Sequence, residues 1–216
     1  MDIQLDRYQI ARDKLIRTLR GKGISDERVL QAFQKVPRHL FVDQALQSQA
    51  YDDNALPIGT GQTISQPYVV ALMTQALNLG TDDKILEIGT GSGFQAAILA
   101  QFSRRVYSIE RHRELGEKTR LKLREMGFHN ITFKIGDGTR GWVQHAPFDR
   151  IIVTAGAPAV PEHLSQQLAI GGRMIIPTGD RQTQQLEVYD RTATGLTREI
   201  GSKVTFVPLV GVQGWE

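Results

Sequence analysis

Apolar residues recur every three or four positions over residues 3–20, as they do on one face of a helix. Gly21 is expected to end this helix. A second pattern of the same kind starts at Ser25, a suitable N-cap, and stops at Pro37. We therefore expect residues 1–48 to form a helical N-terminal preface to the rest of the chain.

Residues 49–66 have no helical period and contain only short hints of strand. The segment is rich in Gly, Pro, Asn, Asp, Ser and Thr, and long ordered loops of this kind often carry function. We therefore expect it to form part of a functional site. A helix should follow from about Pro67, because proline suits the first turn, and Ser65 is a candidate to cap it.

From residue 67 to residue 216, short apolar runs alternate with helical stretches, which is typical of an α/β core with a mostly parallel sheet. A helix over residues 161–170 precedes the last parallel strand, and no long crossover separates the segments after it. The sheet is therefore expected to finish with antiparallel strands. The expected parallel strands are 85–88, 105–109, 131–135, 148–154 and 174–177, and the later ones are a hairpin of 185–189 with 196–200, then 204–207.

The composition, 40% hydrophobic and 23% charged, predicts an ordered globular protein, and we expect a single domain over residues 1–216. A net charge of +3 is too small to indicate a nucleic-acid partner. The absence of cysteine excludes disulfides, thiolate zinc sites and a cysteine nucleophile. The N-terminus lacks a signal-peptide pattern, and no apolar run approaches the ~20 residues that span a bilayer. We expect a cytoplasmic protein, without metal, that binds no membrane.

Three glycines, Gly89, Gly91 and Gly93, follow the apolar strand that contains Glu87. A strand, a glycine loop and a helix form the opening unit of nucleotide-binding α/β folds. The G-x-G-x-G spacing differs from the dinucleotide pattern G-x-G-x-x-G, and no G-x-x-x-x-G-K-[ST] loop is present. A tight connection without a ligand is the alternative interpretation of the glycines.

Acidic residues end the next two strands. Glu110 lies 17 residues after Gly93, where Rossmann-like folds place a carboxylate against ribose hydroxyls. An ordinary acid that caps the next helix is the alternative. Asp137, followed by Gly138, could accept a hydrogen bond from an adenine amino group, although a Gly-Asp-Gly sequence is more often only a turn.

The pattern Glu-x-Gly-x-Gly-x-Gly resembles motif I of the S-adenosylmethionine-dependent methyltransferases. Over about residues 36–215 the chain resembles, more specifically, the protein-L-isoaspartate O-methyltransferase family. The stretches Gln-Thr-Ile-Ser and Phe-Val-Pro-Leu are the most specific. The matching segments are Val36-Pro37-Arg38, Phe41-Val42, Ala50-Tyr51, Leu56-Pro57-Ile58-Gly59, Gln62 to Pro67, Leu86 to Gly93, Ile109-Glu110-Arg111, Gly136-Asp137-Gly138, Ala146 to Asp149 and Phe206 to Leu209.

This resemblance implies a Rossmann-like fold that binds S-adenosyl-L-methionine. It also implies methyl transfer to the free α-carboxylate of L-isoaspartyl residues in damaged proteins and peptides, which begins their repair through a succinimide. Ser65 is the implied active-site residue, with a hydroxyl that orients the carboxylate. We further expect a monomer with no nucleic-acid partner.

The resemblance also implies which residues hold each ligand. Thr63 and Ile64 should lie beside the methionine end of the cofactor. The remaining cofactor residues should be Glu87, Gly89, Gly91, Gly93, Glu110, Asp137 and Gly138. The peptide is expected between two segments, and its candidate contacts are Leu56, Pro57, Ile58, Val207, Leu209 and Val210.

Three other functions are considered as alternatives on the basis of the residues. Amino-methylating enzymes of nucleic acids commonly carry Asn/Asp-Pro-Pro-Tyr/Phe after strand four, where this chain has residues 154–158, Thr-Ala-Gly-Ala-Pro. A short-chain dehydrogenase would need Tyr-x-x-x-Lys, which is absent. The five histidines have no spacing that suggests a triad or a metal site. A scaffold that binds cofactor without transferring a methyl group is the third rival.

Overall fold

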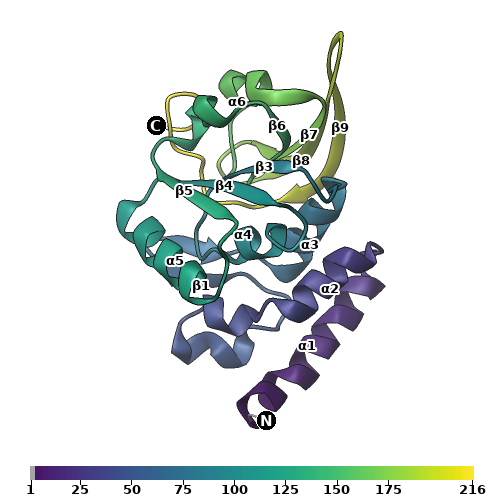
Figure 1. Cartoon of the computed structure of the whole chain (residues 1–216), viewed down its shortest axis with the longest axis vertical. Coiled ribbons are helices and arrows are strands. Elements are labelled where there is room, and N and C mark those ends of the chain that lie inside the picture. The colour runs from purple at the N-terminus through teal and green to yellow at the C-terminus, as the bar shows by residue number, and fades with distance from the viewer. Residues whose placement is uncertain (1–2) are drawn as a thin grey trace.

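The computed structural model describes residues 3–216, with side chains from residue 8 onwards. A twisted central sheet has helices on both faces, and two further helices lie beside one end of the molecule (Figure 1). The helices are α1 (Ile3–Gly21), α2 (Glu27–Lys35), α3 (Pro67–Ala76), α4 (Phe94–Leu99), α5 (Arg113–Glu125) and α6 (Glu162–Gln167). Short 3-10 helices are η1 (Arg38–Phe41), η2 (Gln44–Gln49), η3 (Gly138–Arg140) and η4 (Val143–His145).

The main sheet has the strand order β5-β4-β3-β6-β7-β8-β9. The five strands β5, β4, β3, β6 and β7 pair in parallel. Strand β8 pairs antiparallel with both β7 and β9. The expected α/β fold with a mostly parallel sheet and antiparallel C-terminal strands is therefore confirmed. The strands are β3 (Lys84–Ile88), β4 (Arg105–Glu110), β5 (Ile131–Ile135), β6 (Phe148–Val153), β7 (Leu168–Gly179), β8 (Gln184–Thr192) and β9 (Gly195–Val204).

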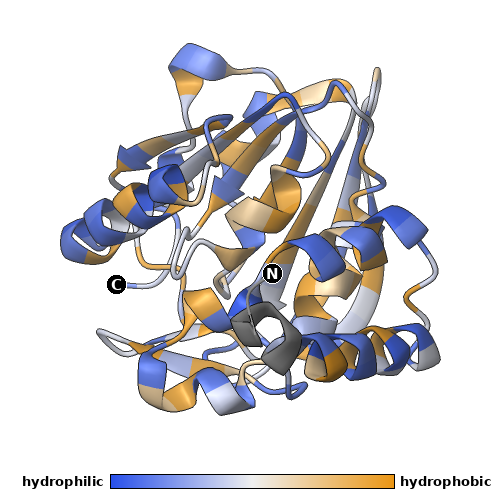
Figure 2. Cartoon of the chain, turned by 60° about the horizontal axis from the view of Figure 1, so that its bottom comes forward, coloured by the Kyte–Doolittle hydropathy of each residue, from blue (hydrophilic) through white to orange (hydrophobic). Residues whose placement is uncertain are grey.

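The apolar strands pack on both faces because their alternate side chains point in opposite directions. In β3, Ile85 joins the core cluster that contains Phe94 of α4. Leu86 and Ile88 join a second cluster, which contains Leu164 of α6. Figure 2 shows hydrophobic colour concentrated along the strands in the middle of the molecule, whereas the outer helices alternate with hydrophilic positions. The sheet is thus buried on both sides, as the apolar runs predict.

The N-terminal helices pack against the core through their apolar faces. Leu19 and Phe33 are buried in the same cluster as Phe94, and the rings of Phe33 and Phe94 meet edge to face at 5.5 Å. The expectation that Ser25 caps the second helix is wrong. Asp26 is the N-cap, because its side chain accepts a hydrogen bond from the backbone N–H of Arg28 at 2.9 Å.

Three other expectations need correction. Residues 49–66 are not simply a loop, since β1 (Leu56–Gly59) and β2 (Gln62–Ile64) pair as an antiparallel hairpin. The helix expected over 161–170 ends at Gln167, because the chain passes directly into β7, which pairs with both β6 and β8. Residues 205–207 form no strand. Their backbone instead leads to a single bridge between Pro208 and Gly156.

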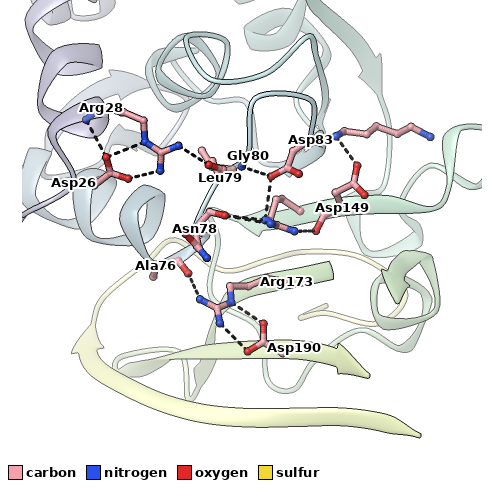
Figure 3. Close-up of polar contacts among 12 residues, drawn as sticks. Asp26, Arg28, Ala76, Asn78, Leu79, Gly80, Asp83, Asp149, Arg173 and Asp190 are labelled. Atoms are coloured by element: carbon pink, nitrogen blue, oxygen red, sulfur yellow. Dashed lines mark hydrogen bonds and ion pairs between the residues drawn. The ribbon is translucent and has the colours of Figure 1, made fainter. Parts of the chain in front are cut away.

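Polar side chains hold the amino edge of the parallel strands together (Figure 3). The guanidinium of Arg150 in β6 lies 3.2 Å from the Asp83 carboxylate and also donates to the carbonyl oxygen of Asn78. Arg173 of β7 forms a two-point ion pair with Asp190 of β8. These contacts fix the segment that leads into β3 and leave the opposite edge of the sheet free for a site.

None of the helices within residues 3–216 has the length and apolar character required to cross a lipid bilayer.

Candidate active site

A cavity of about 260 Å³ lies at the carboxyl edge of the parallel strands. The residues that follow β3, β4 and β6 form one side of it, among them Gly89, Glu110 and Thr154. Hairpin strand β2 and residues 206–210 form the other side. This edge is where open α/β sheets bind their ligands. The cavity therefore brings together segments that are far apart in the sequence.

The glycine loop follows β3 directly. Gly89, Gly91 and Gly93 have φ angles of 95°, 53° and 87°, in the region that favours glycine. A Cβ atom on Gly89 would lie 2.5 Å from the Thr154 hydroxyl oxygen, and one on Gly93 would lie 2.7 Å from a methyl carbon of Leu123. Gly89 and Gly91 line the cavity, whereas Gly93 is absent from its wall and packs against α5. Two of the three glycines thus present backbone to a ligand.

Glu110 lines the cavity from the end of β4 and is 5% exposed. One carboxylate oxygen accepts a hydrogen bond from the N–H of Gly91 at 2.8 Å, and the other accepts from the N–H of His112 at 2.9 Å. The second bond supports the turn before α5, so Glu110 contributes to that turn as well as to the cavity. Each oxygen keeps capacity for a further hydrogen bond from a ligand hydroxyl.

Glu87 lies under the glycine loop and does not line the cavity. It is fully buried, and one of its carboxyl oxygens accepts a short hydrogen bond from Ser108. The Ser108 hydroxyl lies 2.6 Å from that of Thr90, which is in the cavity wall. The pKa of Glu87 is raised to about 8, chiefly by burial; the Ser108 hydrogen bond opposes this rise and the charge of Glu110 adds to it. Glu87 is therefore connected to the cavity only through two hydroxyl groups.

Asp137 and Gly138 end β5 in different roles. Gly138 lines the cavity, whereas Asp137 does not. The Asp137 carboxylate accepts hydrogen bonds from the N–H of Thr139 at 2.9 Å and from the N–H of Val212 at 3.0 Å. Hydrogen bonds from Thr139 and Val212 lower the pKa of Asp137, against the opposing effect of burial. In this structure the carboxylate joins η3 to the C-terminal segment.

Ser65 is placed between two cavities. It lines the first, which we call the inner cavity, together with Thr63 and Ile64, and it also lines a second cavity of about 410 Å³, which we call the outer cavity. Its suggested role as a helix cap is wrong, because Gln66 is the N-cap of α3, and the Gln66 side chain makes no capping hydrogen bond. Asp53 accepts instead from the N–H of Tyr68 at 2.8 Å. Among the described residues no partner hydrogen-bonds the Ser65 hydroxyl.

Arg38 fixes the backbone around Ser65. This side chain is 1% exposed and donates hydrogen bonds to the carbonyl oxygens of Ala50 and Ser65, both at 2.8 Å. Its guanidinium carbon also lies 4.8 Å from the centre of the Phe94 ring. Burial lowers the pKa of Arg38 to about 9, so the guanidinium remains charged at neutral pH. One buried cation thus holds both ends of the 50–65 segment.

The expected peptide contacts fall into two groups. Val207, Leu209 and Val210 line the inner cavity, and Val207 also lines the outer one. Leu56, Pro57 and Ile58 lie on β1 and belong to neither wall. Leu56 is buried in the core, while a side-chain carbon of Ile58 lies 3.8 Å from where a Cβ atom on Gly91 would be. The β1 residues therefore support the site from behind.

Several cavity residues were not anticipated as site residues. Arg111 and His112 follow Glu110 directly, and Thr154 and Ala155 follow β6. All four follow a parallel strand, and this position could have indicated that they lie near the site. Their residue types form no motif of fixed spacing, so the sequence alone did not identify them as site residues. Within the described residues, no group of three or more His, Asp and Glu side chains is arranged to hold a metal ion.

Comparison with known proteins shows the family to which the chain belongs. The sequence profile of the family described as Protein-L-isoaspartate(D-aspartate) O-methyltransferase matches residues 10–214. Protein-L-isoaspartate O-methyltransferase 1 of Syntrophobacter fumaroxidans is 53% identical over 210 residues, covering 97% of this chain and 98% of the relative. The Protein-L-isoaspartate O-methyltransferase of Trichlorobacter lovleyi is 54% identical over 211 residues, covering 97% of each chain.

Solved structures agree with this match. One protein-L-isoaspartate O-methyltransferase superposes with a TM-score of 0.86 at 31% identity, covering 94% of this chain and 67% of that one. A Plasmodium falciparum protein described as the same enzyme, in complex with S-adenosyl-L-homocysteine, gives a TM-score of 0.79 at 25% identity over 91% of this chain and 97% of that one. This chain belongs to the protein-L-isoaspartate(D-aspartate) O-methyltransferase family.

Proposed function

We propose that this protein transfers a methyl group from S-adenosyl-L-methionine to the free α-carboxylate of L-isoaspartyl residues in damaged proteins and peptides, and so begins their repair through a succinimide. Family membership carries the reaction class. One structural observation supports the roles assigned to the two cavities: Ser65 lines both the inner and the outer cavity. The inner cavity would take the cofactor and the outer one the peptide.

The inner cavity fits an adenosine with an amino-acid tail. Gly89 and Gly91 offer backbone without side chains, and Glu110 offers a carboxylate to two ribose hydroxyls. Gly138, Thr63 and Ile64 also line this cavity. We assign Gly138 to the adenine ring and Thr63 and Ile64 to the methionine end. Glu87, Gly93 and Asp137 would act indirectly, by holding the loops around the cofactor in place. When bound, S-adenosyl-L-methionine supplies an electrophilic methyl group on a positively charged sulfur.

The substrate carboxylate needs no base, since a carboxyl group of ordinary pKa, about 4, is ionised at neutral pH. Catalysis therefore rests on holding the carboxylate oxygen in line with the methyl carbon and sulfur. The Ser65 hydroxyl is a neutral donor at the junction of the cavities, so it can orient the carboxylate without neutralising it as an Arg or Lys would. Apolar neighbours such as Val207 and Leu209 would exclude water from this point.

Peptide recognition is proposed to use backbone hydrogen bonds more than side-chain pockets, because the enzyme must accept many sequences. Val207, which lines both cavities, would contact the peptide directly, with Leu209 and Val210 on the inner side of it. Leu56, Pro57 and Ile58 of the β1–β2 hairpin would support the site from behind. We also propose that the protein works as a cytoplasmic monomer on peptide substrates. The cysteine-free sequence fits the reducing cytoplasm that this part of the proposal names.

The test uses labelled S-adenosyl-L-methionine with two synthetic peptides, identical except for isoaspartyl or ordinary aspartyl at one site. We expect base-labile methyl incorporation into the isoaspartyl peptide alone. The Ser65→Ala variant in the same assay reports whether transfer uses the proposed junction. Transfer to neither peptide, with cofactor binding intact, would support a scaffold or another acceptor instead.

A further inference from the structure

The outer cavity contains one charged side chain that the proposed reaction does not use. Lys203 lines this cavity, and it is the single charged residue among the side chains that do so. It is exposed. Within the part of the chain whose side chains are described, its ammonium group has no hydrogen bond, ion pair or aromatic contact. The cation is therefore available to a ligand.

The backbone of Lys203 is held in place although its side chain is free. Lys203 lies next to the end of β9 and pairs with Gln185 of β8 in the antiparallel register. The residues that follow it, from Val204 to Val207, continue along the wall of the same cavity. A peptide in the outer cavity would therefore pass within reach of an ammonium group on a firmly paired strand.

The position of Lys203 determines which part of a substrate it can meet. The reacting carboxylate must lie at the junction of the cavities, beside Ser65, but Lys203 lines the outer cavity and is absent from the wall of the inner one. An ion pair with the reacting carboxylate would also reduce its nucleophilicity. The group that Lys203 meets is therefore a second anionic group on the peptide.

We propose that Lys203 is a specificity-determining residue that favours isoaspartyl substrates with an acidic side chain beside the isoaspartyl residue. This inference rests on the proposed function of the same site. An ion pair at such an exposed position is weak, so the expected preference is about two- to fivefold in kcat/KM. Because salt screens exposed charges, the preference should shrink at high ionic strength.

The experiment compares isoaspartyl peptides that carry Glu, Gln or Lys at one flanking position, with a second set that varies the other flank. Each set is assayed with the wild-type protein, with Lys203→Gln, with the charge reversal Lys203→Glu and with Lys14→Gln. Lys14 is an exposed lysine on α1, so its variant makes the same change in net charge away from the cavities.

At one flanking position we expect the wild-type kcat/KM to be highest for the Glu peptide, intermediate for the Gln peptide and lowest for the Lys peptide. Lys203→Gln should abolish this order with little change for the Gln peptide, Lys203→Glu should reverse it, and Lys14→Gln should keep it. Equal rates for the three peptides at both flanks, or an order that survives in Lys203→Gln, would overturn the inference while leaving methyl transfer established. Failure of every isoaspartyl peptide to accept a methyl group would instead overturn the proposed function.

Discussion

Arg38 donates a 2.8 Å hydrogen bond to the carbonyl oxygen of Ser65, a residue 27 positions later in the chain. The same guanidinium also donates to Ala50, so it joins the two ends of a segment that carries the β1–β2 hairpin. A buried cation in the N-terminal preface thereby positions the backbone of the proposed catalytic residue.

Replacing Arg38 by Met should weaken both stability and turnover. The variant keeps an apolar chain of similar length but leaves the carbonyl oxygens of Ala50, Asn54 and Ser65 without this donor. The loss typically costs about 1–3 kcal/mol for each such group that is buried. We expect a lower midpoint of thermal unfolding and a reduced kcat at a temperature where the variant is still folded. The control is Arg120→Met, at an exposed position of α5. Wild-type kcat in a folded Arg38→Met protein would contradict the positioning role.

Replacing Ser65 by Ala should separate catalysis from binding and from stability. Because the hydroxyl caps no helix, its loss should leave the free energy of unfolding nearly unchanged. Loss of an orienting group can lower turnover by about a hundredfold. We expect a fall of that order in the single-turnover rate, with cofactor affinity within about twofold by calorimetry. Ser65→Thr, which retains a hydroxyl, should recover part of the rate, and a fully active Ala variant would remove Ser65 from the mechanism.

Replacing Glu110 by Gln should weaken cofactor binding. Gln retains the shape and one acceptor oxygen, but loses the charge that strengthens hydrogen bonds to ribose hydroxyls and to the N–H groups of Gly91 and His112. Hydrogen bonds to charged groups contribute about 1.5–3 kcal/mol, so the dissociation constant should rise at least tenfold. Calorimetric titration with S-adenosyl-L-homocysteine measures this change, and far-UV circular dichroism checks the fold. An unchanged dissociation constant would refute the ribose role.

The buried Glu87 predicts a specific dependence of stability on pH. Its pKa is about 8 in the folded protein and near 4.5 ordinarily, so the unfolded chain releases this proton at lower pH than the folded protein does. The contribution of Glu87 to stability is therefore complete below pH 4.5 and is lost progressively as the pH rises to about 8. Glu87→Gln cannot ionise. Its free energy of unfolding, relative to that of the wild type, should increase over this interval, as measured by urea denaturation. A difference that stays constant with pH would show that Glu87 ionises normally.

The sequence predicted the sheet better than it predicted the elements around it. Apolar runs such as 85–88 identify strands because both faces of a parallel sheet are buried. The N-cap of α2 was misplaced by one residue, because Ser25 and Asp26 are both suitable caps and only the fold selects between them. The β1–β2 hairpin was missed, since its strands are short and contain three exposed residues, Pro57, Gly59 and Thr63.

The candidate site was predictable in so far as its residues follow strands in a recognised order. Gly89, Gly91 and Glu110 belong to one βαβ unit, and the structure places all three at one cavity. The position of Asp137 was predictable, but its contact with Val212 was not, because that contact depends on how a distant segment folds back. The roles of the individual site residues, and the division of the chain at residues 48 and 66, stay predictions.

The cavity walls come from distant parts of the chain. Residues 206–210, which follow β8 and β9 in the sequence, line the cavity and are tied to Gly156 by backbone hydrogen bonds at residues 207 and 209. A partly folded chain that has built only β3, β4 and β5 thus lacks one wall of the site. Cofactor should consequently bind the native state in preference to any folding intermediate. Cellular S-adenosyl-L-methionine would then act as a thermodynamic trap that draws the chain towards its completed form.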